Sequence, residues 1–306
     1  MDEFELIKKF FDLNKMDSGV VIGIGDDGAV LEPNINKQQV QVIDTLVENI
    51  HFPSAIDPAD IAYRAVMANL SDIAAMGAIP RWMTLSLTIN NKNDKWIESF
   101  SKGLFEAAEH YRVSLVGGDL NFAENISVTI SISGEVSPSQ ALLRNGAQIG
   151  DSLYVTGTIG DAAGGLELLK KNKPNNELTQ RFLRPTPRIK IGRELIGKAT
   201  AAIDISDGLL GDLKKILVDR NLGVDIQLDL LPISEALSNQ FNSHRCYSFA
   251  LNGGDDYELC FTAKDEDVSN ISGITKVGSL NDSGIILCYL QDNIYKFEDE
   301  SYRHFK

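Results

Sequence analysis

The spacing of apolar side chains predicts most of the regular structure in the N-terminal part of the chain. Apolar residues recur at helical intervals in three segments, residues 3–14, 58–76 and 96–111. Short runs rich in β-branched and aromatic residues predict five strands, at residues 20–22, 40–43, 82–89, 113–116 and 126–136. We expect the second strand to end at Asp44 and the fourth to end at the Gly-Gly-Asp of residues 117–119. This mixed order of strands and helices indicates an α+β domain.

A polar segment at residues 138–149 separates this part from a second one. It carries Pro138 and two glycines, which suits a linker, so we expect domains at residues 1–137 and 150–306. In the second domain the pattern predicts strands at residues 153–156, 202–203, 224–228, 258–262, 274–278 and 285–290. It predicts helices at residues 161–170, 187–198 and 209–218, whereas residues 171–180 are polar and turn-like.

Composition narrows the classes of function. The 306 residues suffice for about two domains. The net charge of −14 argues against binding to nucleic acid or to an anionic membrane surface, because those surfaces are bound mainly through Lys and Arg. The three cysteines show no CxxC spacing, which favours a reduced, cytoplasmic protein. No apolar run approaches the roughly 18 residues that a membrane span needs, and the acidic N-terminus is no secretory signal.

Two glycine-rich motifs match nucleotide-binding signatures in their residue spacing but not in their context. GIGDDG at residues 23–28 has the GxGxxG spacing, but Pro33 follows too soon for a helix and two carboxylates would repel a pyrophosphate. Residues 192–198 match GxxxxGK, but Ala199 replaces the Ser or Thr that would hold magnesium. We reject both the dinucleotide-binding and the P-loop interpretations.

Aspartates at the predicted ends of strands, most of them close to a glycine, are the most informative pattern. Each single site is better explained as an ordinary turn. Five such sites in a chain without His or Cys clusters favour hard cations instead, magnesium above all. These sites are Asp26-Asp27, Asp44, Asp119, Asp204 with Asp207, and Asp255-Asp256.

Asp72 adds an independent indication. On the predicted helix 58–76 it shares a face with Ile61, Ala65 and Ala68, where a carboxylate is costly unless it is paired or bound to a cation. Arg64 lies two turns away and is an alternative partner. Several magnesium sites without a nucleophile suggest phosphoryl transfer, in which the protein mainly positions groups and neutralises charge.

The motifs together resemble the thiamine-monophosphate kinase family, within the superfamily of aminoimidazole ribonucleotide synthetase and selenophosphate synthetase. The resemblance covers the chain from end to end. The matching runs are GIGDDG (23–28), DTLVENIHF (44–52), DPA (57–59), NLSDIAAMGA (69–78), GGD (117–119), YVTGTIG (154–160), LRPTPR (183–188), AIDISDGL (202–209) and NGGDDYELCF (252–261).

The resemblance implies a two-domain PurM-like fold, with a dimerising N-terminal mixed sheet and a C-terminal α/β sandwich. It also implies direct transfer of the ATP γ-phosphate to thiamine monophosphate, giving thiamine diphosphate, with no covalent nucleophile. The implied partners are ATP, several Mg²⁺ ions and a second copy of the chain. The positions implied as magnesium ligands are Asp27, Ile43, Asp44, Asp72, Asp119, Asp204 and Asp207. Those implied in ATP binding are Gly118, Asp119, Arg144 and Ser206, and those implied in substrate binding are His51, Asp255 and Tyr302.

Two positions depart from the family pattern. The family usually has Ser-Thr before Asp44, where this chain has Val42-Ile43, so only the Ile43 carbonyl remains as a ligand there. The family often has Glu where Asp255 stands, and the shorter side chain requires a shifted substrate or a bridging water.

Three of these side chains have a structural interpretation beside the functional one. Arg144 is a surface cation or a γ-phosphate contact, His51 a structural or a substrate-binding histidine, and Tyr302 a packing aromatic or a stacking platform. Tyr111 is a weaker candidate near the adenine. Two alternative functions also remain open, namely another ATP-dependent enzyme of the superfamily and a non-catalytic nucleotide-binding module.

Overall fold

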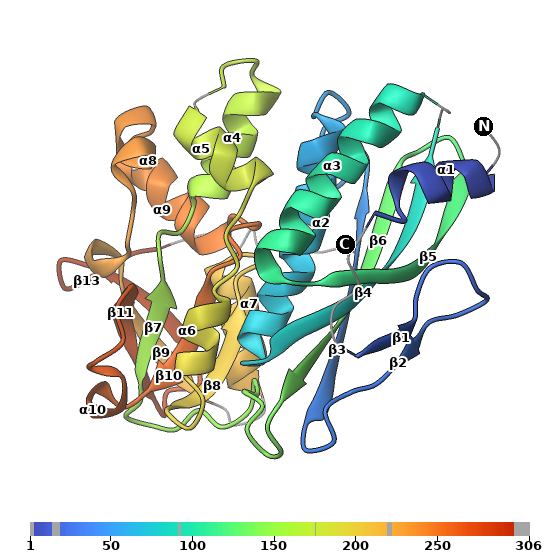
Figure 1. The fold of residues 1–306 in the computed structure, drawn as a ribbon. Helices are drawn as coiled ribbons and strands as arrows, with labels where there is room; N and C mark the ends of the chain where they lie inside the picture. Colours follow the sequence, from blue (N-terminus) through green and yellow to red (C-terminus); the bar gives the residue numbers. More distant parts are fainter. Residues whose placement is uncertain (1–2, 14–18, 91–92, 175, 219–221, 297–306) are drawn as a thin grey trace. The chain divides into compact units, whose positions relative to one another are not determined.

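The computed structural model describes residues 3–13, 19–90, 93–174, 176–218 and 222–296, and the chain divides into two compact units. The first unit comprises residues 1–73 and 78–139, and the second comprises residues 74–77 and 140–306. The helices of the first unit are α1 (Glu3–Phe10), α2 (Pro58–Ala75, whose last two residues belong to the second unit) and α3 (Asp94–Tyr111). Its strands are β1 (Val20–Ile22), β2 (Val30–Leu31), β3 (Gln38–Val47), β4 (Ile79–Ile89), β5 (Ser114–Phe122) and β6 (Ser127–Val136) (Figure 1).

A four-stranded sheet in the order β3-β6-β4-β5 forms the centre of the first unit. β3 and β4 both run antiparallel to β6, whereas β4 and β5 are parallel. Alternate residues such as Val40, Leu46, Val128 and Ile130 are buried, so one face of the sheet is apolar and covered. The other face carries mostly serines, threonines and glutamines.

Two of the predicted strand ends are wrong. β3 continues past Asp44 to Val47, because β6 pairs with it over ten successive positions. β5 continues through residues 117–119 to Phe122, because β4 pairs with it there. Aspartate and glycine are disfavoured in isolated strands, but pairing with a neighbouring strand outweighs that preference. Asp44 and Asp119 therefore lie within strands and not in turns.

Helix α2 packs against the apolar face of the sheet. Asp57 caps its first turn as predicted, since its carboxylate accepts a hydrogen bond from Ala59 N at 2.9 Å. A side chain at Gly134 of β6 would come within 3.0 Å of Ile73, which places α2 directly on the sheet. Gly103 of α3 lies against the backbone of Ala59, so the two long helices are in close contact.

The β-hairpin β1–β2 stands apart from the sheet and is held by a polar anchor. A two-stranded hairpin alone is only marginally stable. Glu135 of β6 is buried and accepts hydrogen bonds from Asn34 N and from Arg81 Nη1, both at 2.9 Å. Arg81 also lies over the ring of Trp82, 4.9 Å from its centroid. These contacts fix the base of the hairpin whose connecting loop carries Asp26 and Asp27.

The second unit is built on a seven-stranded sheet in the order β13-β12-β9-β11-β7-β10-β8. Its strands are β7 (Ser152–Thr156), β8 (Ala199–Asp204), β9 (Gly223–Gln227), β10 (Leu259–Ala263), β11 (Ile274–Asn281), β12 (Ile286–Leu290) and β13 (Asn293–Ile294). Its helices are α4 (Asp161–Lys170), α5 (Asn176–Leu183), α6 (Ile189–Glu194), α7 (Leu209–Leu217), α8 (Glu235–Gln240), α9 (Ser243–Asn252) and α10 (Asp265–Val268).

This sheet is covered on both faces. All five residues of β10 are buried, and its side chains alternate between two apolar clusters. Cys260 packs with the apolar face of α7 on one side, whereas Phe261 packs with Tyr154 and Leu195 on the other. The arrangement is a sheet between helical layers, as expected for an α/β sandwich.

Three sequence predictions for the second unit need correction. The polar segment 171–180 contains most of α5, whose Leu178 and Phe182 are buried although most of its residues are polar. The helix predicted over residues 187–198 is only the six residues of α6. Helices α8 and α9 were not predicted at all. α8 has few apolar residues, whereas Cys246, Phe249 and Ala250 of α9 follow a helical spacing that could have identified its buried face.

Within the described part of the chain, every helix is too short or too polar to cross a lipid bilayer.

Candidate functional site

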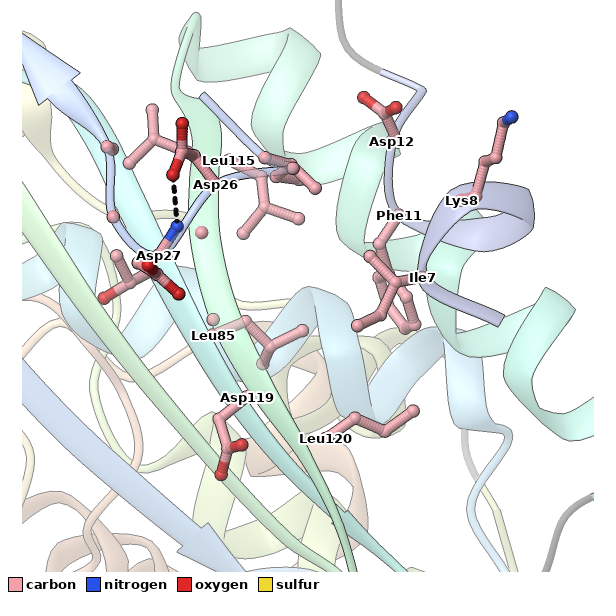
Figure 2. A pocket seen from close by; sticks show the side chains of 18 of the residues that line it. Ile7, Lys8, Phe11, Asp12, Asp26, Asp27, Leu85, Leu115, Asp119 and Leu120 are labelled. Atoms are coloured by element: carbon pink, nitrogen blue, oxygen red, sulfur yellow. Dashed lines mark hydrogen bonds between the residues drawn. The ribbon is translucent and has the colours of Figure 1, made fainter. Parts of the chain in front are cut away.

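A pocket of about 820 Å³ opens in the first unit between the β1–β2 loop, strands β4 and β5, and helix α1 (Figure 2). The loop contributes Asp26 and Asp27, and β5 contributes Asp119. In Figure 2 the carboxylates of Asp27 and Asp119 lie on one side of β5, while Ile7 and Phe11 of α1 lie on the other. The pocket thus combines a carboxylate-bearing wall with an apolar one.

Glycines bring the backbone of this pocket within reach of a ligand. Gly25, Gly28 and Gly117 have open space where a side chain would stand, so nothing shields their backbone. Gly118 differs, because a Cβ there would lie 2.0 Å from the carbonyl oxygen of Leu85. The GGD sequence therefore pairs closely with β4 on one side and leaves its backbone accessible on the other.

The side chains of Asp26 and Asp119 accept hydrogen bonds from residues close to them in the sequence. Asp26 Oδ1 accepts a hydrogen bond from Asp27 N at 2.9 Å, and Asn121 Nδ2 donates to Asp119 Oδ2. The carboxylates of Asp27 and Asp119 remain solvent-exposed. Exposed carboxylates beside unshielded backbone are suited to a partly hydrated cation that binds together with an anionic ligand.

The remaining predicted positions of the first unit are spread over other elements. Ile43 is 66% exposed, on the polar face of the sheet. Asp44 has the strand parity of the buried Val40 and Leu46, so its half-buried side chain is directed to the opposite, helix-covered face. The structure does not bring Asp44 into the pocket that holds Asp119, because the two lie on the opposite edge strands β3 and β5.

Asp72, His51 and Tyr111 also lie outside the pocket lining. Asp72 is half-buried on α2, between the buried residues Ser71 and Ile73. His51 accepts a hydrogen bond from Val47 N at 3.0 Å through Nδ1, which closes the turn after β3. Tyr111 ends α3, where its ring packs edge-on against His110.

In the second unit, the predicted residues gather on two neighbouring loops. Asp204 is the buried last residue of β8, and the loop after it carries Ser206 and Asp207. Asp255 N donates a hydrogen bond to Ser206 O at 2.9 Å, so the loop before β10 lies directly on the loop after β8. The structure therefore brings Asp204, Ser206, Asp207 and Asp255 together, although Asp255 precedes a strand and does not follow one.

Asp212 and Lys215 of α7 organise this region and were not predicted. Asp212 is fully buried, and its Oδ2 accepts hydrogen bonds from Ser206 N and Asp207 N, both at 2.9 Å. Lys215 Nζ lies 2.8 Å from carboxylate oxygens of both Asp207 and Asp212. Burial opposes the charge of Lys215, but its hydrogen bonds to the two carboxylates hold its pKa above the ordinary value. Asp212 falls on the apolar face of α7, which is the signal that sequence reasoning could have used.

The glycine turn after β7 is already occupied by a carboxylate of the chain. Asp256 is fully buried and accepts hydrogen bonds from Gly160 N at 2.6 Å and Ala162 N at 3.2 Å, at the start of α4. Burial raises the pKa of Asp256 to about 8, against the opposing effects of these N–H donors and of Arg181. An external phosphate would have to displace Asp256, so this turn is structural.

The segment that carries Arg144 runs beside β8, since Ala202 N donates a hydrogen bond to Leu143 O at 2.9 Å. Arg144 is exposed in the segment between β6 and β7, which contains neither helix nor strand. Tyr302 lies outside the described residues.

No group of three or more His, Cys, Asp or Glu side chains within the described ranges is close enough to hold a metal ion. Magnesium rarely uses such cages, because it keeps several waters and binds through one or two carboxylates together with substrate phosphates. The carboxylates of Asp27 and Asp119 in the first unit, and of Asp207 in the second, fit that mode of binding.

Comparison with known proteins establishes the family. Residues 25–136 match the family described as AIR synthase related protein, N-terminal domain, and residues 148–273 match the corresponding C-terminal domain. Thiamine-monophosphate kinase of Haemophilus influenzae is 45% identical, over 87% of this chain and 83% of that protein. The chain belongs to the thiamine-monophosphate kinase family. A family member from Bacillus subtilis is 35% identical over the full length of both chains.

Solved structures of the thiamine-monophosphate kinase family show the same fold. The enzyme from Stenotrophomonas maltophilia superposes with a TM-score of 0.87 at 37% identity, covering 96% of this chain and 98% of that one. AaThiL complexed with AMPPCP and TMP superposes with a TM-score of 0.81 at 32% identity, covering 99% and 96%. The fold is therefore the two-domain PurM-like fold that the sequence motifs predicted.

Proposed function

We propose that this chain transfers the γ-phosphate of ATP to thiamine monophosphate and releases thiamine diphosphate. The observation that carries the proposal is the likeness to thiamine-monophosphate kinases over most of both chains, including a structure that holds AMPPCP and TMP together. AMPPCP is an ATP analogue that cannot donate its γ-phosphate, so its presence beside TMP supports a reaction in which both substrates are bound at once.

The pocket of the first unit supports a role in handling phosphates. Its open backbone at Gly117 lets an anion approach closely, and its carboxylates at Asp27 and Asp119 hold cations rather than bare anions. These residues would hold Mg²⁺, which neutralises charge on the transferring phosphoryl group. In the same proposal Gly118 and Asp119 bind ATP, with Tyr111 and Arg144 as further ATP contacts.

The second unit would supply further metal-binding side chains and further contacts with the acceptor. Asp204 ends β8 and Asp207 lies on the short loop after it, whose backbone Asp212 holds, so both fit the proposed metal-ligand role. Ser206 on this loop is a proposed ATP contact, and Asp255 on the neighbouring loop is a proposed substrate contact.

The remaining positions keep their proposed roles from the family resemblance. Asp44, Asp72 and the Ile43 carbonyl are proposed as metal ligands, and His51 and Tyr302 as substrate contacts. The hydrogen bond from Val47 N occupies Nδ1 of His51, so any contact of this ring with substrate runs through Nε2.

We also propose that the enzyme works as a cytoplasmic homodimer. The polar face of the four-stranded sheet, with Ile43 exposed on it, fits the sheet-to-sheet pairing that the family resemblance implies. Sedimentation equilibrium would distinguish a dimer from the 33.6 kDa monomer.

The decisive experiment is direct. The purified chain is incubated with ATP, thiamine monophosphate and Mg²⁺, and thiamine diphosphate and ADP are quantified by chromatography. We expect the two products in equal amounts, and no turnover when EDTA removes Mg²⁺. ATP hydrolysis without thiamine diphosphate, or no reaction with any metal, would contradict the proposal and favour another activity of the superfamily.

A further inference from the structure

Three motifs of the second unit have no assigned role, yet they meet at one buried carboxylate. They are the turn TGTIG at residues 156–160, the segment LRPTPR at residues 183–188, and the residues that lead into β10. β10 pairs with β7 on one side and with β8 on the other, which places the start of β10 beside the ends of both strands. Glu258 stands at that start and is fully buried.

Glu258 is bound from three elements at once. It accepts hydrogen bonds from Thr156 Oγ1 of β7 at 2.6 Å, from Arg181 Nη2 of α5 at 2.8 Å and from Arg188 Nε at 2.5 Å. Arg188 Nη2 also donates to the other carboxylate oxygen, so the guanidinium binds in bidentate fashion. Gly157 must be a glycine here, because a Cβ would lie 2.3 Å from Glu258 Oε1. A carboxylate at 0% exposure needs this degree of compensation.

The loop that ends at Glu258 is strained where it carries the proposed substrate contact. Asp255 and Tyr257 adopt φ values of 73° and 52°, in the left-handed region that residues with a Cβ rarely occupy. Strain of this kind persists only where the surroundings fix the backbone.

Backbone contacts at both ends supply that constraint. Tyr257 N donates to Ile205 O at 2.9 Å, and Ile205 N donates to Glu258 O at 2.7 Å. Gly254 allows the close approach, because a Cβ there would lie 2.3 Å from Ser206 O. The loop before β10 and the loop after β8 therefore behave as one body, which the side chain of Glu258 ties to α5, α6 and β7.

We infer that Glu258 is a positioning residue for the acceptor substrate. Held by Arg181, Arg188 and Thr156, it fixes the strained loop so that Asp255 faces the bound thiamine monophosphate beside Asp204 and Asp207. This inference rests on the proposed function. Glu258 itself touches no substrate, because its whole side chain is buried and both carboxylate oxygens are occupied.

A second buried network provides the matched control. Asp151, next to β7, is buried and accepts a hydrogen bond from Thr200 Oγ1 of β8 at 2.6 Å, and Thr200 Oγ1 lies 2.6 Å from Thr262 Oγ1 of β10. It ties together the same three strands at their opposite ends, away from the loops that carry Asp204 and Asp255. A loss of stability alone should therefore have the same effect on activity whichever network is weakened.

The test compares E258Q, R188K and T200V with the natural chain. KM and kcat are measured for each substrate with the other saturating, and the melting temperature is recorded. We expect E258Q to raise KM for thiamine monophosphate on the order of 10- to 100-fold. The rise in KM for ATP should be smaller, because Asp212 still holds the backbone of Ser206 and Asp207. R188K keeps the charge but loses the bidentate geometry, so an intermediate rise is expected. T200V should lower the melting temperature and leave both KM values unchanged.

Each outcome decides the inference. Unchanged KM for thiamine monophosphate in the folded variants would overturn it, and so would an equal rise in T200V. If E258Q does not fold, R188K carries the comparison. Failure of the natural chain to form thiamine diphosphate would overturn the proposed function and this inference with it, whereas turnover with an unaltered KM would overturn this inference alone.

Discussion

Gly117 and Gly118 show how two identical residues in sequence serve different physical purposes. Both lie in β5 and border the pocket of the first unit. Gly117 has no atom within 4 Å of the place where a Cβ would stand, whereas Gly118 is packed against the backbone of Leu85. The first glycine keeps space open for a ligand, and the second permits close strand pairing.

Substituting alanine at these two positions should separate the two purposes. G118A places a Cβ 2.0 Å from the Leu85 carbonyl oxygen, so β5 must shift, and we expect a loss of about 1–3 kcal/mol in the free energy of unfolding. G117A is the control, with an expected change within about 0.5 kcal/mol, because nothing opposes its side chain. Urea denaturation of both variants measures the difference. Equal stability of the two would show that β5 is not pressed against β4.

Charged side chains join elements of this protein that the backbone alone would leave loosely connected. Glu135 ties the β1–β2 hairpin to the central sheet of the first unit through Asn34 and Arg81. Asp265 of α10 plays a similar part in the second unit, where it accepts hydrogen bonds from Tyr154 of β7 and Lys276 of β11, both at 2.7 Å. These hydrogen bonds make the stability of the attached element depend on the ionisation state of a single carboxylate.

The hydrogen bonds of Asp265 to Tyr154 and Lys276 should make part of the free energy of unfolding depend on pH. Hydrogen bonds from Lys276, Ser152 and Tyr154 lower the pKa of Asp265 from 3.8 to about 2. Because the pKa is lower in the folded state, this contribution is complete above about pH 4 and is lost as the pH falls toward 2. Its size is about 0.5–1 kcal/mol, since the side chain is 57% exposed and solvent weakens the interaction.

The measurement compares the natural chain with D265N by urea denaturation between pH 6 and the lowest pH at which both still fold. The stability difference between them should shrink on acidification below about pH 4. A difference that stays constant over this range would mean that Asp265 is not held in its charged form by the fold.

The whole molecule carries a net charge of −14 and yet belongs to a family of kinases named for a phosphorylated acceptor, thiamine monophosphate. Coulomb repulsion opposes the binding of ATP to so acidic a chain unless a cation intervenes. In the proposed function, carboxylates that bind divalent ions would convert this unfavourable field into a requirement for metal.

Thermal shift measurements should show this requirement directly. ATP with Mg²⁺ at about 100 times the dissociation constant should stabilise the chain by about 2.7 kcal/mol, whereas ATP with EDTA should have little effect. Mg²⁺ alone is the control for stabilisation by the ion itself. An equal shift with and without Mg²⁺ would contradict a role for metal in nucleotide binding.

The elements with strong periodicity were predictable from the sequence, because local spacing of apolar residues decides them. Helix α2, with its Asp57 cap, and α4 were predicted within one residue of their ends. Polar segments such as α5 were missed, because only packing against neighbouring helices selects the helical state. Strand pairing likewise carried β3 through Asp44, which local preference had placed at its end.

The sequence by itself determined the family, the class of chemistry and the identity of the acidic motifs, because those depend on residue types and spacing along the chain. Only the tertiary structure decided which carboxylates share a loop or a pocket, and which are buried and hydrogen-bonded within the protein. Asp256 belongs to one of the predicted cation sites, and Asp212 and Glu258 are acidic residues of the same kind. Each of the three is fully buried and bound by N–H or side-chain donors of its own chain. Burial and hydrogen bonding are properties of the packed chain, and together they identify the carboxylates whose oxygens serve the structure and not a ligand.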